Sequence, residues 1–153
     1  FRDTRFSKEK TPYKNNFGAY IAKGGRKMGS AGYYIHIEPD NSFYAGGVYM
    51  PPPENLKNIR DAILNDTAAF KKLISSREFT DRFGEIWGEK LTGVPRGYDK
   101  NFKDIDLLKY KSYSMVEMVS DKQLTARDFG EKAIQSFLAM KAVNDFLNKA
   151  MGI

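Results

Sequence analysis

His36 is the only histidine of the chain, and it stands two residues before Glu38 in the segment YYIHIEP. Alternate residues of a strand share a face, so His36 and Glu38 would project together, on the same side as Tyr34. A carboxylate beside an imidazole raises the pKa of the ring and fixes its tautomer, as in a general base. The pair is therefore a candidate catalytic site. The alternative is a partly buried histidine that a neighbour satisfies.

The first residues of the chain, FRDTRFSKEKTPYK, interleave cations with aromatic rings. Arginine offers a planar fork for phosphate, lysine a flexible point charge, and aromatic rings stack on nucleic-acid bases. The stretch is therefore a candidate anion-binding segment. The candidate ligand-binding residues are Arg2, Arg5, Lys8, Lys10, Tyr13 and Lys14, together with His36 and, from a later loop, Arg96. The alternative is that the rings face the core while the charges face water.

The charge of the chain is concentrated at this end. The net charge is +6 at pH 7, and residues 1–30 contain eight basic and two acidic side chains, which account for all of the excess. Such an asymmetry indicates an anionic partner for the basic end. A solvated basic surface, or one that pairs with acidic residues upstream, is the alternative.

Several other chemistries have little support. One histidine without cysteine cannot supply the nitrogen and sulfur ligands of zinc, so no metal site or cofactor is expected, although a carboxylate magnesium site stays open. The glycine-rich GGRKMGSAG (24–32) lacks the Gly-Lys-Ser/Thr end of a phosphate loop and leads into a strand. The absence of cysteine, of a long apolar run and of a signal-like segment favours a cytoplasmic protein without a membrane partner.

Three strands and a later fourth would position the candidate residues. An antiparallel meander is expected at 18–22, 33–38 and 43–50, and a further strand is expected within 107–119. Gly46-Gly47 in the third segment indicates a bulge, or a place where another backbone or a ligand comes close.

Periodic apolar residues predict helices at about 56–63, 70–74 and 79–83, with a break near Asn65-Asp66. A long C-terminal helix is expected with Thr125 as its N-cap and Asp128 three residues on. A chain of 153 residues suits one domain. The sequence therefore predicts a single α+β domain over 1–153, in which a small antiparallel sheet packs against helices.

Four ordered blocks point to a known family: RDTRFSKEKTPYKNNFGAYI, AGYYIHIEP, AGGVYMPPPENLKNIR and PRGYDKNFKDIDLLKYKS. Together they resemble the bacterial family catalogued as domain of unknown function 2461, over nearly the whole chain. Members usually have a helical segment before the first block, so the resemblance implies that Phe1 begins a trimmed fragment. It implies no catalytic residues, because the family has no established activity.

Three functions stay open from the sequence. The first is a binding domain for a phosphate-bearing ligand, a nucleotide or nucleic acid, through the basic N-terminal stretch. The second is a structural or partner-binding domain, whose basic stretch docks on a preceding segment or on another protein. The third is a hydrolase with His36 as acid or base, Glu38 orienting it, and Arg2, Arg5 or Arg96 steadying negative charge. No recognisable nucleophile or metal set supports the third.

Overall fold

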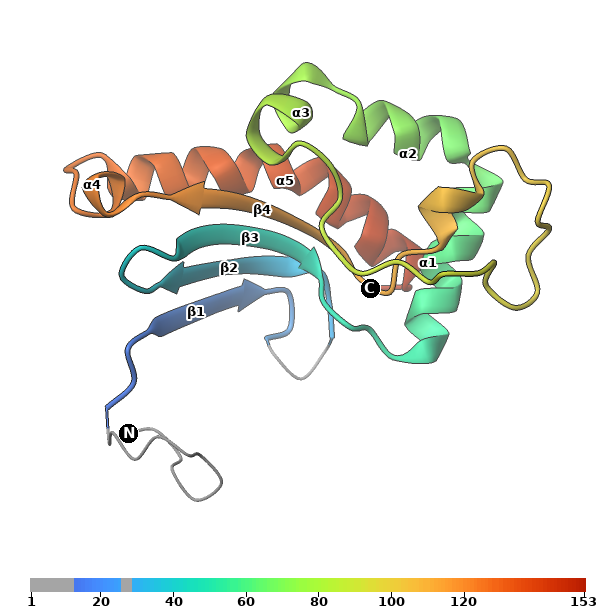
Figure 1. The fold of residues 1–153 in the computed structure, drawn as a ribbon, viewed down its shortest axis with the longest axis horizontal. Coiled ribbons are helices and arrows are strands. Elements are labelled where there is room, and N and C mark those ends of the chain that lie inside the picture. The colour runs from blue at the N-terminus through green and yellow to red at the C-terminus, as the bar shows by residue number, and fades with distance from the viewer. Residues whose placement is uncertain (1–12, 26–28) are drawn as a thin grey trace.

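Four strands form one antiparallel sheet in the order β1-β2-β3-β4. The computed structural model describes residues 13–25 and 29–153. The strands are β1 (Phe17–Ala22), β2 (Gly32–Ile37), β3 (Ser42–Val48) and β4 (Tyr113–Val119). The predicted meander is confirmed, and the predicted later strand pairs with β3 at the far edge of the sheet (Figure 1).

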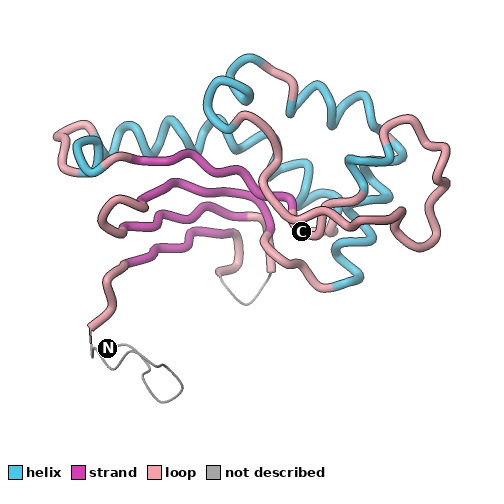
Figure 2. Tube along the Cα trace, viewed as in Figure 1, coloured by secondary structure: helices cyan, strands magenta, loops and turns pink. Residues whose placement is uncertain are grey.

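The helices lie on one side of this sheet. They are α1 (Pro53–Asn65), α2 (Thr67–Ile74), α3 (Arg77–Phe83), the 3-10 helix η2 (Ile105–Leu108), the short α4 (Asp121–Leu124) and the long α5 (Phe129–Ala150). Figures 1 and 2 show α5 along the sheet, with α2 and α3 beyond it. The α+β prediction with a long C-terminal helix is confirmed. None of the helices in the described residues has the length and apolar character to span a membrane.

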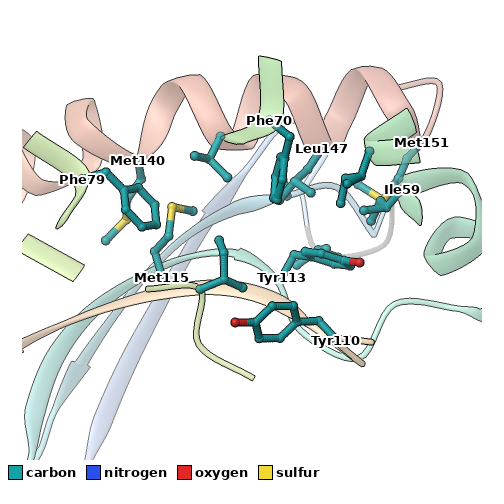
Figure 3. Close-up of a cluster of buried hydrophobic side chains, with 14 of the residues drawn as sticks. Ile59, Phe70, Phe79, Tyr110, Tyr113, Met115, Met140, Leu147 and Met151 are labelled. Atoms are coloured by element: carbon teal, nitrogen blue, oxygen red, sulfur yellow. The ribbon is translucent and has the colours of Figure 1, made fainter. Parts of the chain in front are cut away.

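The core fills the space between α5 and the sheet. Phe70 of α2 and Met140 and Leu147 of α5 meet Tyr113 and Met115 of β4, and all five side chains are completely buried (Figure 3). Burial of this kind is the main favourable term in folding. We call this side of the sheet the covered face.

Two asparagines of α5 fix the beginning of β2. The Asn144 side-chain amide donates to the Gly32 carbonyl over 3.0 Å. The Asn148 side chain accepts from the Ala31 N–H at 2.8 Å and donates to the Ala31 carbonyl at 3.2 Å. Because a backbone group buried without a partner is costly, these bonds hold the start of the strand that contains Tyr34 and His36.

The two adjacent glycines of β3 allow close approach. The pairing of β3 with both neighbours continues through them without an extra residue, so the bulge alternative is wrong. A Cβ on Gly46 would lie 2.6 Å from Met140 Sδ, and one on Gly47, whose φ is +100°, would overlap the Tyr113 carbonyl oxygen. The absence of a side chain at Gly46 therefore lets helix α5 pack close to β3, and its absence at Gly47 lets the backbone of β4 come close.

The predicted start of the C-terminal helix is wrong. Ser120 forms a capping box with Gln123 and begins the separate helix α4, which ends at Thr125. The Thr125 hydroxyl donates back to the Asp121 carbonyl at 3.0 Å, so it closes one helix instead of starting the next. Helix α5 begins only after Asp128.

The predicted strand within 107–119 is shorter than expected. Its first part is η2, and Leu108 of η2 is completely buried. The Tyr113 hydroxyl donates to the Leu107 carbonyl at 2.9 Å, which turns this segment back against the strand. The third predicted strand also ends earlier than expected, at Val48, because Met50 has a φ of +44° and precedes a proline.

Candidate ligand-binding site

The side of the sheet away from the helices, which we call the open face, is formed by cross-strand neighbours. Tyr20 of β1 stands opposite Tyr34 of β2, and Gly18 stands opposite His36. A Cβ on Gly18 would overlap the Tyr34 hydroxyl, and one on Gly32 would lie 2.9 Å from Tyr20 Oη. Each tyrosine therefore lies across a glycine of the neighbouring strand, an arrangement that only a residue without a side chain permits.

His36 is held on three sides. Its Nδ1 lies 3.1 Å from the Tyr34 hydroxyl, its Nε2 lies 3.2 Å from Glu38 Oε2, and its ring stacks on Phe43 with centroids 4.7 Å apart. These partners assign the tautomer, since the Tyr34 hydroxyl donates to Nδ1 while Nε2–H donates to Glu38. The side chain is 14% exposed. His36 and Glu38 therefore do share a face, as the alternation predicts.

Glu38 joins the end of β2 to two other segments. The Asn15 amide donates to Oε1 at 2.6 Å and the Asn41 amide donates to Oε2 at 2.8 Å. The bond from Asn41, then the one from His36, and with them the one from Asn15, hold the pKa of Glu38 below its usual value. A carboxylate that accepts several hydrogen bonds stays ionised, and here it ties the residues before β1 to the β2–β3 turn.

A groove of about 1350 Å³ runs over the open face. Its lining includes aromatic residues from four parts of the chain: Tyr20, Tyr34, Phe43, Tyr49 and Trp87. His36 and Glu38 are not among the lining residues. Both ring nitrogens of His36 have partners within the protein. The geometry therefore matches the alternative of a histidine that its neighbours satisfy, and the ring positions Tyr34 by a hydrogen bond and Phe43 by stacking.

The groove has a positive bias. Lys14 lies in its lining, and none of the acidic side chains in the described part of the chain does. Asn16 and Asn41 add amide donors at the same end of the sheet as Glu38. A surface with rings, amides and a cation and without carboxylates suits a flat ligand of negative charge.

Comparison with protein-family models gives one match, to the family described as "Conserved hypothetical protein (DUF2461)", over residues 1–146. The chain belongs to the DUF2461 family. The match confirms the resemblance that the four blocks indicate. No curated protein and no solved structure matches the chain. The family description assigns no activity, so the function of this DUF2461 chain must be argued from its own geometry.

The basic stretch of this DUF2461 chain is described only at its end. Arg2, Arg5, Lys8 and Lys10 lie outside the described residues. Tyr13 is 72% exposed, and Lys14 is the first residue of the stretch seen in the groove lining. Because Asn15 bonds to Glu38, the chain that follows the basic stretch is attached to the end of β2 that contains His36.

Arg96 lies elsewhere. Its loop, residues 91–101, lies at the end of the molecule opposite the β2–β3 turn (Figure 1), and Arg96 is exposed and does not line the groove. The loop is attached to α1, because the Tyr98 hydroxyl donates to Asp61 Oδ1 at 2.7 Å. Burial and this bond raise the pKa of Tyr98 to about 12. The structure therefore separates Arg96 from the other candidate residues.

The sequence argument placed Tyr34 on this face but missed the other rings of the groove, Tyr20, Phe43, Tyr49 and Trp87. Within each predicted strand, the period of two indicates which residues share a face with Tyr20 or with Phe43. Whether these two residues lie on the same face of the sheet depends on the register between the strands. Trp87 follows α3 in a segment without apolar periodicity. It reaches the sheet through a bridge to Ser114, which no local pattern indicates.

Proposed function

We propose that this DUF2461 chain is a binding domain for a phosphate-bearing ligand with a flat base, a nucleotide or single-stranded nucleic acid, on the open face of its sheet. The observation on which this rests is the groove lined by aromatic rings and free of the described acidic side chains. Base–aromatic stacking contributes about 1–3 kcal/mol per base and tolerates any base. The rings thus supply binding energy without requiring a particular sequence.

The placement of the tyrosines supports stacking. Tyr34 lies across Gly18 and Tyr20 lies across Gly32, so at these two positions no side chain of the neighbouring strand displaces either ring. Phe43 is backed by the ring of His36, and Tyr20 is anchored by a 2.7 Å bond from its hydroxyl to the Ser30 carbonyl. Rings fixed in advance lose little conformational freedom when a ligand binds, which favours affinity.

The charge of the chain supports a phosphate group. Lys14 lies in the lining, and the sequence places four further cations, Arg2, Arg5, Lys8 and Lys10, within the twelve residues before it. Lysine and arginine that neutralise phosphates release counterions, so binding must weaken as salt rises. For single strands the slope of log K against log salt is about −0.7 for each neutralised phosphate.

The test is equilibrium binding of nucleotides and short single-stranded oligonucleotides at low and moderate salt. Tyr20→Ala and Phe43→Ala should each weaken binding by about 5- to 150-fold, which corresponds to one lost stack. Ile21→Ala is the matched control, since Ile21, like Tyr20, is an exposed apolar residue of the same strand but projects to the opposite side. Lys14→Glu should reduce both the affinity and the salt slope.

Two results would overturn the proposal. One is the absence of binding to any of these ligands at low salt. The other is binding that Tyr20→Ala and Phe43→Ala leave unchanged, because the ligand would then bind away from the open face.

The hydrolase alternative has weaker support, since the two nitrogens of His36 are already occupied within the protein.

A protein partner is the second candidate, and β1 favours it. Phe17 and Ile21 are 74% and 55% exposed on the helix side of β1, opposite the open face, and the outer edge of β1 pairs with no other described strand. An exposed apolar edge strand is a site where another chain can add. Ile21→Lys should abolish such an association and leave nucleotide binding unchanged, as sedimentation at several protein concentrations would measure.

A further inference from the structure

The groove continues past the sheet to three exposed side chains. Tyr49 and Met50 follow β3, Trp87 follows α3, and the three are 68%, 66% and 54% exposed. The rings of Tyr49 and Trp87 lie with centroids 6.4 Å apart and planes tilted by 31°. Large rings left in solvent on a folded protein are unusual enough to mark a binding surface.

The backbone behind these rings is fixed. The Met50 N–H donates to Ser112 Oγ at 2.9 Å, and Met50 keeps a φ of +44°, which a residue with a side chain rarely adopts. Trp87 exchanges two backbone bonds with Ser114 of β4, at 2.7 and 3.2 Å. A strained residue held by its surroundings is a feature of functional sites, and here it directs Tyr49 and Met50 away from the core.

The space around the rings is larger than one nucleotide needs. Small-ligand pockets have volumes of about 300–1,000 Å³, whereas the groove on the open face measures about 1350 Å³. A second cleft of about 790 Å³ shares Tyr49, Met50 and Trp87 with it. This cleft extends the surface past Trp87 toward Lys90 and Lys111, whose charges are balanced in the same lining by Glu85 and Glu89, so it offers a ligand the aromatic pair and not a net positive charge.

We infer that Tyr49 and Trp87 form a second base-stacking site, and that the ligand is a single strand of several nucleotides that crosses the open face and reaches this pair. The inference rests on the proposed function, because the first stacking site is the one formed by Tyr20, Tyr34 and Phe43. A single nucleotide occupies only one of the two sites, whereas a longer strand gains the second contact without a new loss of translational freedom.

Trp87 provides the measurement, because it is the only tryptophan of the chain. Its fluorescence is followed while the protein is titrated with thymidine nucleotides of one, three, six and nine units, and binding is measured in parallel by calorimetry. The longer strands should quench Trp87 and bind at least about 5-fold more tightly than the mononucleotide, which is the smallest effect of one further stacked base. The mononucleotide should bind at the open face without quenching Trp87.

Variants separate the two sites. Tyr49→Ala should remove the gain with length, a loss of about 5- to 150-fold in the affinity of the long strands relative to that of the mononucleotide. Phe43→Ala should weaken every ligand. Leu138→Ala is the matched control, because Leu138 of α5 is 64% exposed on the helix side of the molecule and should change neither affinity nor quenching.

The outcomes distinguish the two claims. If the mononucleotide binds through Phe43 but length brings neither quenching nor affinity, the second site is refuted and the proposed function stands. If long strands quench Trp87 and Phe43→Ala has no effect, the strand does not cross the open face, and both the proposed function and this inference are refuted. If a peptide quenches Trp87 where the oligonucleotides do not, the ligand class is refuted.

Discussion

The same strands form both faces of the sheet, but side chains on the covered face are buried against helices, whereas side chains on the open face stay partly exposed. On the covered face, Tyr113 and Met115 are completely buried against helices α2 and α5. On the open face, the alternate residues of the same strand include Met118, which is 59% exposed. On the open face, Tyr34, His36 and Glu38 form a continuous series of side-chain hydrogen bonds.

This difference separates stability from recognition. Buried apolar side chains contribute to folding in proportion to the surface they remove from water. Rings that stay partly exposed contribute less to folding and remain available to a ligand. Substitutions on the covered face should therefore change mainly the free energy of unfolding, and substitutions on the open face should change mainly ligand affinity.

The largest effect is expected for Phe70→Ala. Phe70 is completely buried and packs against Tyr113 and Phe146, with ring centroids 6.1 and 5.1 Å away, so its loss should destabilise the protein by about 3–5 kcal/mol. Phe43→Ala on the open face removes the same side chain from a partly exposed site and should cost clearly less. Urea unfolding measures both, and equal losses would contradict the distinction between the faces.

A pair of glycines gives the next test. Gly46→Ala on the covered face meets Met140 of α5 at 2.6 Å and the Gly32 carbonyl at 3.3 Å, so we expect a loss of about 1–3 kcal/mol from overpacking. Gly18→Ala on the open face meets the Tyr34 ring, which can turn outward into the groove. It should cost less in stability but reduce nucleotide affinity. Gly93→Ala, with no atom within 4 Å of the added Cβ, is the control.

The smallest effect is expected from Glu38 and depends on pH. Because hydrogen bonds hold the pKa of Glu38 below its ordinary value of 4.5, ionised Glu38 stabilises the folded state above that pH. This contribution is lost as the pH falls through the lower pKa of the folded state. Melting temperatures of the wild type and Glu38→Gln should converge below pH 4.5 and differ above it. Glu131→Gln, an exposed change on α5, serves as control; parallel curves for wild type and Glu38→Gln would refute the assignment.

The strands and their alternation could be predicted because they depend on local chemistry. β-branched and aromatic residues bounded by glycine, proline and asparagine indicate strands, and the period of two places Tyr34, His36 and Glu38 together. The start of the last helix could not be predicted in the same way. Two capping signals, at Ser120 and at Thr125, lie within six residues, and local propensity does not decide between them.

The candidate site was predicted only in part. The shared face of His36 with Glu38 is found as expected, and Lys14 lies in the groove lining, although its binding of a ligand stays a prediction; the loop that contains Arg96 lies at the far end of the molecule. Phe43 joins the groove through the predicted pairing of its strand with β2, whereas Trp87 joins it through a bridge to Ser114 of β4 that local periodicity does not indicate.

By itself, the sequence determined which residues alternate along each strand, where the cations concentrate and to which family the chain belongs. Only the tertiary structure decided which face of the sheet the helices cover and which rings meet on the other face. It also decided that both nitrogens of the histidine are satisfied internally. The physical reason is that these features depend on strand register and on contacts such as Asn144 with Gly32, which join residues 112 positions apart.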